Sequence, residues 1–416
     1  MKVAICGLIT SENLGEWFIA DSLKYIIKTK FLEKTAKKPE SLDFVFVDIL
    51  ANNEQVIPSE NPITRRTKNC YKYRRSGLPA EVVDSSIRKL AGKTKLVALH
   101  KIRHFIWNHA YNFRPRYSLY YDEKFRGVNL IVIDGGGILE YSPNEYQEPL
   151  NLISKYGEEH NIPIVYNAIG SSGEFEVGDY RCKILMNALR SQAVKYISAR
   201  DSVDIVRQCV GSTHKVALLA DAAFWCRETY GIEKRPATDC VGIGIIRGNA
   251  LQRYKVDFTE EDWIDLFEGI AKELVKRGYT YFFFTNGMMA DYRLGGVICE
   301  RMNLPEGKLV KRPEQATELM DTISGCAGLI TCRMHSSIAA TSLGIPSVVM
   351  SWNSKIDKYF EILGYPERAI QVENFNAGFV VDSFERALRE GMPGQVSDRM
   401  RELAMKSVDG YINMLA

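Results

Sequence analysis

The sequence has no CxxC pair and no Cys/His cluster, although it contains nine cysteines. Disulfide frameworks and structural zinc sites need regularly placed cysteines, so this scatter predicts reduced thiols and no structural metal. No uninterrupted apolar run approaches the roughly 18 residues that a membrane-spanning helix requires. The first residues contain one lysine and then a strand-like stretch, so we expect no signal peptide. These absences predict a cytoplasmic protein.

Motifs for several common cofactors are missing as well. Neither GxGxxG nor GxxxxGK[ST] occurs, which disfavours a nicotinamide site and a triphosphate-binding P-loop. No DxD-like carboxylate pair is apparent, so we expect no metal in the reaction. The 416 residues, 46% of them hydrophobic and 25% charged, are typical of a globular chain with two or three domains.

Apolar strands alternate with stretches of helical spacing, which predicts an α/β fold with parallel sheets. The expected strands lie at residues 2–8, 44–49, 128–133, 162–169, 195–199 and 215–220, and again at 241–246, 281–284, 329–332 and 347–350. A polar stretch without periodicity after Trp225 marks a domain boundary. The expected division is a first domain at 1–232, a second at 233–380 and closing helices at 381–416.

Positive charge is concentrated in one segment. Residues 61–126 contain sixteen Lys and Arg against four Asp and Glu, a local charge of +12 in a chain whose net charge is +3. Within this segment, residues 96–113 place apolar side chains along one helical stripe, which predicts a basic amphipathic insertion in the first domain. Three interpretations are open: a solvated helix packed on that domain, a helix at an anionic membrane surface, and a site for an anionic acceptor. No nucleic-acid module surrounds the segment, so nucleic acid is not an expected partner.

Three loops follow predicted strands, where open parallel sheets collect their ligands. The first, GLITSENLGE at residues 7–16, leads into a helix whose free N–H groups favour anions. The second, from Asp134 to Gly137, has glycines that let a ligand approach the backbone. The third contains Arg200, which can hold a carboxylate or phosphate in bidentate fashion, and Asp201, which we expect to cap the next helix. Plain turns and an Arg200 ion pair are the structural alternatives.

The most specific pattern follows the strand at residues 329–332. Arg333 and His335 stand one residue apart, immediately before a predicted helix. A fixed cation, a titratable imidazole and a helix N-terminus suit an anionic substrate that undergoes proton transfer. The next strand leads to Lys355, which we expect on the same rim. A structural hydrogen bond for His335 and a surface position for Lys355 are the alternatives.

Together, in this order, the motifs resemble one known family. They are NxG(D/E) after the first strand, DGGG, SARD, ADAAF, RMHSSIAATSLGIPSV and WNSK, and over roughly residues 2–364 they resemble the polysaccharide pyruvyl transferases. R-x-H-[SA] before a helix and a GIP turn is the most specific element. The chain departs from the family pattern at Glu16, where many members have Asp, and at Ala222, where Pro is usual.

The resemblance implies two Rossmann-like halves arranged as in GT-B glycosyltransferases. It implies phosphoenolpyruvate as donor, no further cofactor, and a sugar diol as acceptor, with a pyruvate ketal on a capsule, exopolysaccharide or cell-wall saccharide as product. Carried over by position, the donor-binding arginines fall on Arg200 and Arg333 and the central histidine on His335. The expected catalytic residues are His335 and Arg333, the expected donor-binding residues are Arg200, Arg333, His335, Ser336 and Lys355, and the expected acceptor-binding residues are Asn13, Glu16, Asp134, Gly135 and Gly136.

The residue types suit this chemistry. Two arginines and a helix N-terminus can neutralise the carboxylate and phosphate of phosphoenolpyruvate without a metal. His335 can protonate the methylene carbon or deprotonate the attacking hydroxyl. A GT-B glycosyltransferase using a nucleotide sugar and a non-catalytic saccharide-binding protein are the alternatives. An acceptor on a lipid diphosphate would bring the basic segment to the anionic inner face of the cytoplasmic membrane.

Overall fold

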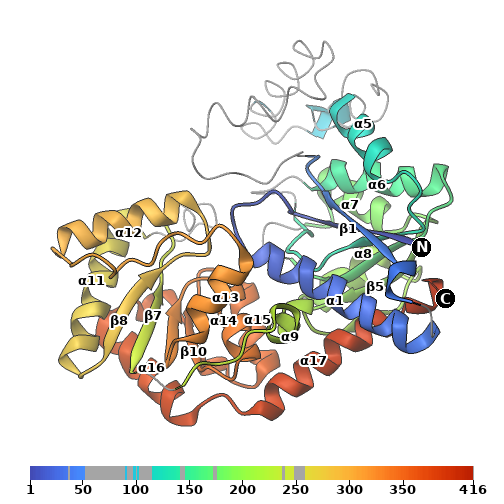
Figure 1. Ribbon diagram of the computed structural model, residues 1–416. Coiled ribbons are helices and arrows are strands. Elements are labelled where there is room, and N and C mark those ends of the chain that lie inside the picture. Colours follow the sequence, from blue (N-terminus) through green and yellow to red (C-terminus); the bar gives the residue numbers. More distant parts are fainter. Residues whose placement is uncertain are drawn as a thin grey trace. The chain divides into compact units, whose positions relative to one another are not determined.

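Two parallel β-sheets, one in each of two units, organise the chain in this computed structural model (Figure 1). The structure describes residues 1–35, 38–51, 115–140, 146–171, 176–236, 239–247 and 258–415, together with residues 90, 97–99 and 101–102. Unit 1 comprises Met1–Thr10, Ile27–Leu219 and Ser407–Ala416, and unit 2 comprises Ser11–Ile26 and Ala220–Lys406.

The sheet of unit 1 has six strands in the order β2-β1-β3-β4-β5-β6. They are β1 (Lys2–Gly7), β2 (Asp43–Asp48), β3 (Leu130–Ile133), β4 (Ile164–Ile169), β5 (Val194–Ala199) and β6 (Val216–Leu218). Strands β3 and β4 are buried along their whole length, as expected for a parallel sheet covered on both faces.

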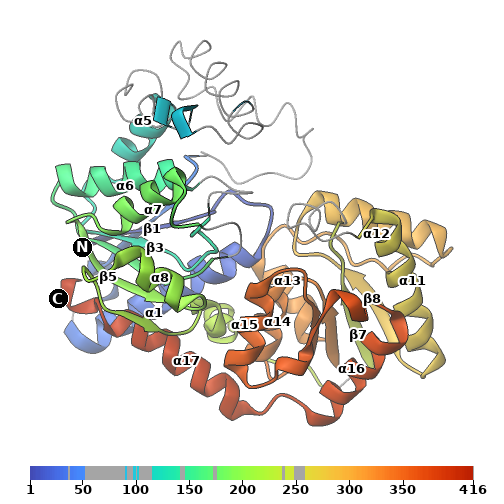
Figure 2. The same ribbon diagram turned by 180° about the vertical axis from the view of Figure 1, so that it is seen from behind.

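Helices cover both faces of this sheet. They are α1 (Gly15–Thr35), α5 (Pro115–Lys124), α6 (Gln147–Glu159), α7 (Tyr180–Leu189), α8 (Val203–Val210) and the end of α17 (Gly394–Asp409), with the short helices η1 (Pro39–Ser41) and η6 (Ile412–Leu415). In Figure 1 α1 lies in front of the strands, and in Figure 2, seen from behind, α7 and α8 do. The end of α17 lies on the α1 face, where Asp409 pairs with Lys30 at 3.4 Å.

The sheet of unit 2 has five strands in the order β11-β10-β9-β7-β8. They are β7 (Cys240–Gly244), β8 (Thr280–Phe284), β9 (Gly328–Thr331), β10 (Ser347–Met350) and β11 (Ala369–Ile370). The helices are α9 (Cys226–Tyr230), α11 (Glu260–Lys276), α12 (Met289–Arg301), α13 (Ala316–Ser324), α14 (Met334–Ser342), α15 (Ser354–Leu363) and α16 (Ala377–Glu390), with the short helices η3 (Ala222–Trp225), η4 (Pro366–Arg368) and η5 (Val372–Asn374). Helix α11 contacts α16, and α14 contacts β9, β10 and η3.

Both sheets reverse their order of strand addition after the second strand. The reversal falls between β1 and β3 in unit 1 and between β7 and β9 in unit 2. In open α/β sheets, ligands bind at the carboxyl ends of the strands beside such a reversal. Residues that follow these strands are therefore the first place to look for a site.

The expected α/β class is confirmed, and each expected strand coincides with a strand of the structure. Strand β11 was not expected, because two residues, Ala369 and Ile370, are too few to display an alternation. The expected closing helices correspond to α16 and α17. Among the described helices, none is long and apolar enough to span a bilayer.

The division into units differs from the expected boundaries. The chain enters unit 2 after Leu219 rather than at residue 232, because η3 and α9 pack against α14. Residues 11–26 also belong to unit 2, and residues 407–416 return to unit 1. Apart from residues 97–99 and 101–102, the expected amphipathic helix at 96–113 lies outside the described residues.

Candidate functional site

The carboxyl ends of three neighbouring strands supply polar residues at one edge of the unit 2 sheet. Arg247 follows β7, Asn286 follows β8, and Arg333 follows β9 and is the N-cap of α14. This is the edge beside the reversal between β7 and β9, so the topology marks it as the candidate site of unit 2.

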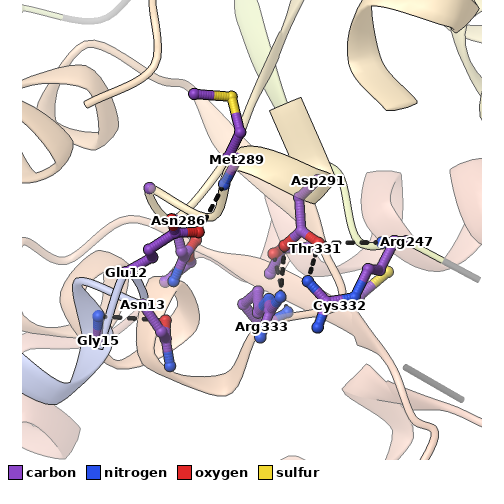
Figure 3. A network of polar contacts seen from close by, with 12 residues as sticks. Glu12, Asn13, Gly15, Arg247, Asn286, Met289, Asp291, Thr331, Cys332 and Arg333 are labelled. Carbon is purple, nitrogen blue, oxygen red and sulfur yellow. Dashed lines mark hydrogen bonds and ion pairs between the residues drawn. The ribbon is translucent and has the colours of Figure 1, made fainter. Parts of the chain in front are cut away.

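Asp291 joins the two arginines (Figure 3). Its side chain is fully buried in the first turn of α12. Oδ1 accepts the backbone N–H of Arg247 at 3.2 Å and lies 3.8 Å from the Nη1 of Arg247, while Oδ2 accepts the Nη2 of Arg333. Two guanidinium groups against one carboxylate leave a net positive charge at this edge, which favours an anionic ligand.

Two buried donors at the same edge have no hydrogen-bond partner among the described residues. One is the Nε of Arg333, and the other is the Nδ2 of Asn286, a residue that is only 1% exposed. Asn286 is fixed next to α14, because the Ser336 hydroxyl donates to its Oδ1 at 2.6 Å. A buried donor without a partner costs about 1–3 kcal/mol, so these groups are suited to a ligand that accepts hydrogen bonds.

The loop that precedes α1 packs on the β8–α12 loop. The Leu14 N–H donates to the Asn286 carbonyl at 2.9 Å, and Glu12 Oε2 accepts the Met289 N–H at 3.0 Å. Position 287 must be glycine, because its φ is +95° and a Cβ there would lie 2.5 Å from the Glu12 carbonyl oxygen. The N-x-G loop thus belongs to the same unit as Arg333 and His335.

Asn13 and Glu16, the expected acceptor-binding residues of this loop, contact one another. The Asn13 Nδ2 donates to Glu16 Oε1 at 3.1 Å, and the Asn13 Oδ1 accepts the Gly15 N–H at 3.3 Å. Asn13 thus satisfies one backbone N–H at the start of α1, and Glu16 holds the Asn13 amide in place. Their role toward an acceptor stays a prediction.

His335 lies in the first turn of α14 and is 9% exposed. Its Nε2 lies 3.6 Å from Oδ2 of Asp221, which is 3% exposed. On another side of the ring, a Cβ built on Gly15 would lie 2.7 Å from both the Cβ and the Nδ1 of His335. Only glycine allows α1 to begin this close to the imidazole.

Lys355 follows β10 in the first turn of α15. Its Nζ lies 5.3 Å from the centre of the Trp352 ring, and the Trp352 Nε1 donates to the Cys332 carbonyl at 2.7 Å. Trp352 therefore ties the loop after β10 to the loop that carries Arg333. Lys355 is half-buried over that contact.

In unit 1, Arg200 forms the ion pair that was the structural alternative. It is 6% exposed, and its Nε donates to the Asp201 Oδ2 at 3.3 Å. The expectation that Asp201 caps α8 is wrong: Ser202 is the N-cap, with φ of +47° and no side-chain cap. Asp201 Oδ1 instead accepts the Ser171 N–H at 3.1 Å.

The Asp134–Gly137 loop packs on its own sheet. Asp134 is 2% exposed, and a Cβ on Gly7 would overlap its carboxylate. A Cβ on Gly135 would lie 2.7 Å from the Ala168 carbonyl oxygen, and the Gly136 N–H donates to the Asp134 carbonyl. A structural close approach thus accounts for Gly135, and a role toward the acceptor stays a prediction.

Four residues of the site were not expected from the sequence. Arg247 and Asn286 carry a usable signal, because each follows a strand at its carboxyl end. Asp221 lies in the ADAAF motif of the family resemblance, but no local pattern links it to His335, which lies 114 residues further along the chain. Asp291 carries no signal, because its partner Arg333 lies 42 residues further along the chain. Within the described ranges, no group of three or more His, Cys, Asp or Glu side chains is placed to hold a metal ion.

Solved structures resemble the chain over nearly its whole length at low sequence identity. A UDP-GlcNAc 2-epimerase from Methanocaldococcus jannaschii matches with a TM-score of 0.51 and 12% identity, over 98% of this chain and 99% of that one. A UDP-GlcNAc 2-epimerase from Neisseria meningitidis has a TM-score of 0.48 and 10% identity, over 100% and 99% of the two chains. A UDP-glucosyltransferase from Polygonum tinctorium has a TM-score of 0.47 and 9% identity, over 99% and 98%.

At this low identity the likenesses show the fold alone. The first structure, with a TM-score above 0.5, indicates that the two parallel-sheet α/β units have structural neighbours of the GT-B fold. No curated protein matches the chain. The model of one family, described as polysaccharide pyruvyl transferase, matches residues 92–354. That span covers more than half of the sequence and includes Arg200, Arg333 and His335. The chain therefore belongs to the polysaccharide pyruvyl transferase family.

Proposed function

We propose that the protein transfers pyruvate from phosphoenolpyruvate to a sugar diol as a ketal, with release of phosphate, in the synthesis of a capsule, exopolysaccharide or cell-wall polymer. The observation that carries this proposal is the arrangement at the edge of the unit 2 sheet. Arg333, anchored by Asp291, and His335, facing Asp221, stand at the start of one helix within the family-matched span.

The donor's negative charge is the first requirement that this edge meets. Asp291 holds Arg333 through Nη2, and this leaves the guanidinium Nε as a buried donor. The N-terminus of α14 adds the positive end of a helix dipole. We assign donor binding to Arg200, Arg333, His335 and Lys355, and Ser336 acts by fixing Asn286.

The reaction needs three proton movements, one to the methylene carbon and one from each of the two sugar hydroxyls. The methylene carbon of phosphoenolpyruvate gains a proton, and the first sugar hydroxyl adds to the neighbouring carbon as it loses its own proton. The bond from that carbon to the phosphate oxygen then breaks, and the second hydroxyl closes the ketal while its proton leaves with the phosphate. A positioned imidazole contributes about a hundred- to ten-thousandfold to such transfers, and His335 is the proposed group.

We propose that no metal or other cofactor takes part, because fixed cations supply the charge that a metal would otherwise neutralise. Activity is expected to persist after dialysis against a chelator. Loss of activity in chelator and recovery with Mg²⁺ would contradict this part of the proposal.

The acceptor is proposed to be a saccharide, with Asn13, Glu16, Asp134, Gly135 and Gly136 on the acceptor side. If it is carried on a lipid diphosphate, the +12 segment at residues 61–126 would contact the anionic inner membrane face. Co-sedimentation with anionic vesicles should weaken with salt and drop when Lys101, Arg103, Arg114 and Arg116 are changed to Gln. Equal partitioning of both proteins would contradict membrane contact.

Calorimetric titration separates the proposal from its main alternative. Phosphoenolpyruvate is expected to bind the wild-type protein, and inorganic phosphate is expected to compete with it. UDP-GlcNAc serves as the probe for a nucleotide-sugar site. Binding of UDP-GlcNAc without binding of phosphoenolpyruvate would favour a GT-B glycosyltransferase instead.

A further inference from the structure

Asn286 carries a buried amide, just after β8, whose two polar atoms are used differently. Its Oδ1 accepts the Ser336 hydroxyl at 2.6 Å, whereas its Nδ2 has no hydrogen-bond partner among the described residues. The residue as a whole is only 1% exposed. An unpaired buried donor is costly, so one that is kept at the edge of a candidate site indicates a partner that binds there.

Contacts on several sides hold this amide in place. The Asn286 carbonyl accepts the Leu14 N–H at 2.9 Å, and the Arg312 Nη1 donates to the carbonyl of the next residue, Gly287. Arg312 is itself buried, with 7% of its surface exposed. The direction of Nδ2 is therefore fixed as long as Ser336 donates to Oδ1. A donor that is fixed before the ligand arrives loses little freedom on binding.

The Nε of Arg333 is a second donor of the same kind. Its guanidinium is anchored to Asp291 through Nη2, and the Nε is buried without a partner in the part of the chain that the structure describes. Arg333 is the N-cap of α14, but its side chain does not cap the helix. The Ser336 N–H donates to the Arg333 carbonyl at 3.1 Å, in the first turn of the same helix. Both donors are thus held at the start of α14, and both side chains are drawn in Figure 3.

The combination of donors selects the chemistry of the ligand. An amide NH₂ group and a guanidinium N–H donate and do not accept, whereas a sugar hydroxyl also needs an acceptor for its own proton. The N-terminus of α14 adds a partial positive charge that favours an anion. A carboxylate has two oxygens, but a phosphate group presents three to donors that come from different elements. Phosphate therefore fits the Asn286 amide, the Arg333 Nε and the helix start together.

We infer that the Asn286 Nδ2 and the Arg333 Nε bind the phosphate group of the donor substrate, with Ser336 as a positioning residue that keeps the amide turned toward it. That this phosphate belongs to phosphoenolpyruvate rests on the proposed function. The phosphate site itself is a property of unit 2 alone. Inorganic phosphate can make the same contacts, so it serves as the probe.

Calorimetric titration with inorganic phosphate tests the site without any turnover. Asn286→Ala removes Nδ2 and is expected to weaken phosphate binding about ten- to a hundredfold, the usual effect of one charge-assisted hydrogen bond. Ser336→Ala leaves Nδ2 in place and removes only its support, so a loss of less than about tenfold is expected. A wild type that does not bind phosphate, unchanged binding in Asn286→Ala, or equal losses in the two variants would overturn the inference.

Asn167→Ala is the matched control. Asn167 is also 1% exposed, and its Oδ1 accepts the Ser407 hydroxyl at 2.7 Å in unit 1. This variant should melt at a lower temperature than the wild type and still bind phosphate with the wild-type Kd. A loss of binding as large as that of Asn286→Ala would attribute both losses to destabilisation and overturn the inference.

Asn286→Asp covers the case in which Asn286→Ala does not fold. The aspartate keeps an acceptor for the Ser336 hydroxyl and has nearly the same shape. It places a second acceptor where the phosphate needs a donor, so phosphate binding is expected to be lost. Phosphate binding with the wild-type Kd in Asn286→Asp would overturn the inference.

Phosphoenolpyruvate separates this inference from the proposed function. If Asn286 contacts the phosphate group, Asn286→Ala should weaken the binding of phosphoenolpyruvate and of inorganic phosphate by a similar factor. A loss confined to phosphoenolpyruvate would place Asn286 against another part of the donor and overturn the inference. If the wild type binds phosphate but not phosphoenolpyruvate, the proposed function fails while the phosphate site stands.

Discussion

Arg333 is held by Asp291 through the Nη2 end of its guanidinium, and the Nε of the same group stays without a partner among the described residues. A carboxylate with no exposed surface thus anchors a cation that keeps a donor available for a ligand. The pair lies beside the strand reversal between β7 and β9. The account of donor binding depends on this relationship.

Replacing Arg333 with Lys tests it. A lysine ammonium is a point charge and cannot bind Asp291 while presenting a second, planar donor. Loss of one charge-assisted hydrogen bond costs about 1.5–3 kcal/mol, so phosphoenolpyruvate should bind roughly ten- to a hundredfold more weakly. Calorimetry measures the change. An unaltered Kd in a protein with unaltered melting would remove the anchored arginine from donor binding.

Asp291→Asn should destabilise unit 2. Removing one partner of a buried ion pair leaves an uncompensated charge and typically costs about 3–5 kcal/mol. Urea unfolding measures this cost. Asp265→Asn is the control, because Asp265 pairs with Arg301 at 2.6 Å on the surface, where its side chain is 60% exposed. Equal stability of the two variants would show that Asp291 is not a buried anchor.

Gly15→Ala is expected to reduce turnover strongly while the protein stays folded. The new Cβ would lie 2.7 Å from the Cβ and Nδ1 of His335, so the imidazole or the start of α1 must move. A displacement of about 1 Å can cost about a hundredfold in rate. Gly296→Ala in α12 is the control, because a Cβ there meets nothing within 4 Å. Similar turnover of both variants would mean that the close approach to His335 is unimportant.

The buried phenol of Tyr359 should lower the free energy of unfolding at alkaline pH. Burial raises the pKa of Tyr359 to about 12, and hydrogen bonds with Ser337 and Thr341 oppose that rise. The unfolded chain, with a tyrosine pKa of about 10, ionises first, so this contribution is complete below pH 10. It is lost as the pH rises toward 12, by about 2–3 kcal/mol.

Tyr359→Phe removes this ionisation. The variant should be about 1 kcal/mol less stable at neutral pH, because the hydrogen bonds are lost. Urea unfolding at several pH values should show the gap to the wild type closing above pH 10 and changing sign before pH 12, because the loss of about 2–3 kcal/mol exceeds the initial gap of about 1 kcal/mol. Other tyrosines titrate equally in both proteins and cancel in the comparison. A gap that is constant with pH would contradict the assigned cause.

Much of the fold could be predicted from the sequence, because buried parallel strands read as short apolar runs between helix-length stretches. The strands around Arg333 are of this kind. Strand β11 has only two residues and leaves no such pattern. The predicted cap at Asp201 failed because its carboxylate binds the Ser171 N–H and Arg200, while Ser202, with φ of +47°, is the N-cap.

Site residues at strand ends could be predicted from the sequence, whereas contacts between residues far apart in the sequence could not. Arg333 and His335 stand at a strand end, and a strand end can be recognised from neighbouring residues. Asp291 and Asp221 reach them only because the order of the strands brings α12 and η3 to the same edge. The same holds for residues 11–26, whose place in unit 2 no local pattern indicates.

The most direct test of the central claim is the release of phosphate from phosphoenolpyruvate with a panel of lipid-linked and nucleotide-linked saccharides, together with the mass of the saccharide product. The account predicts phosphate release that depends on the saccharide, and a product heavier by pyruvate minus water. It also predicts almost no release by His335→Ala, although that variant still binds phosphoenolpyruvate. A His335→Ala variant within a few-fold of the wild-type turnover, or a saccharide that gains a sugar instead of pyruvate, would contradict it.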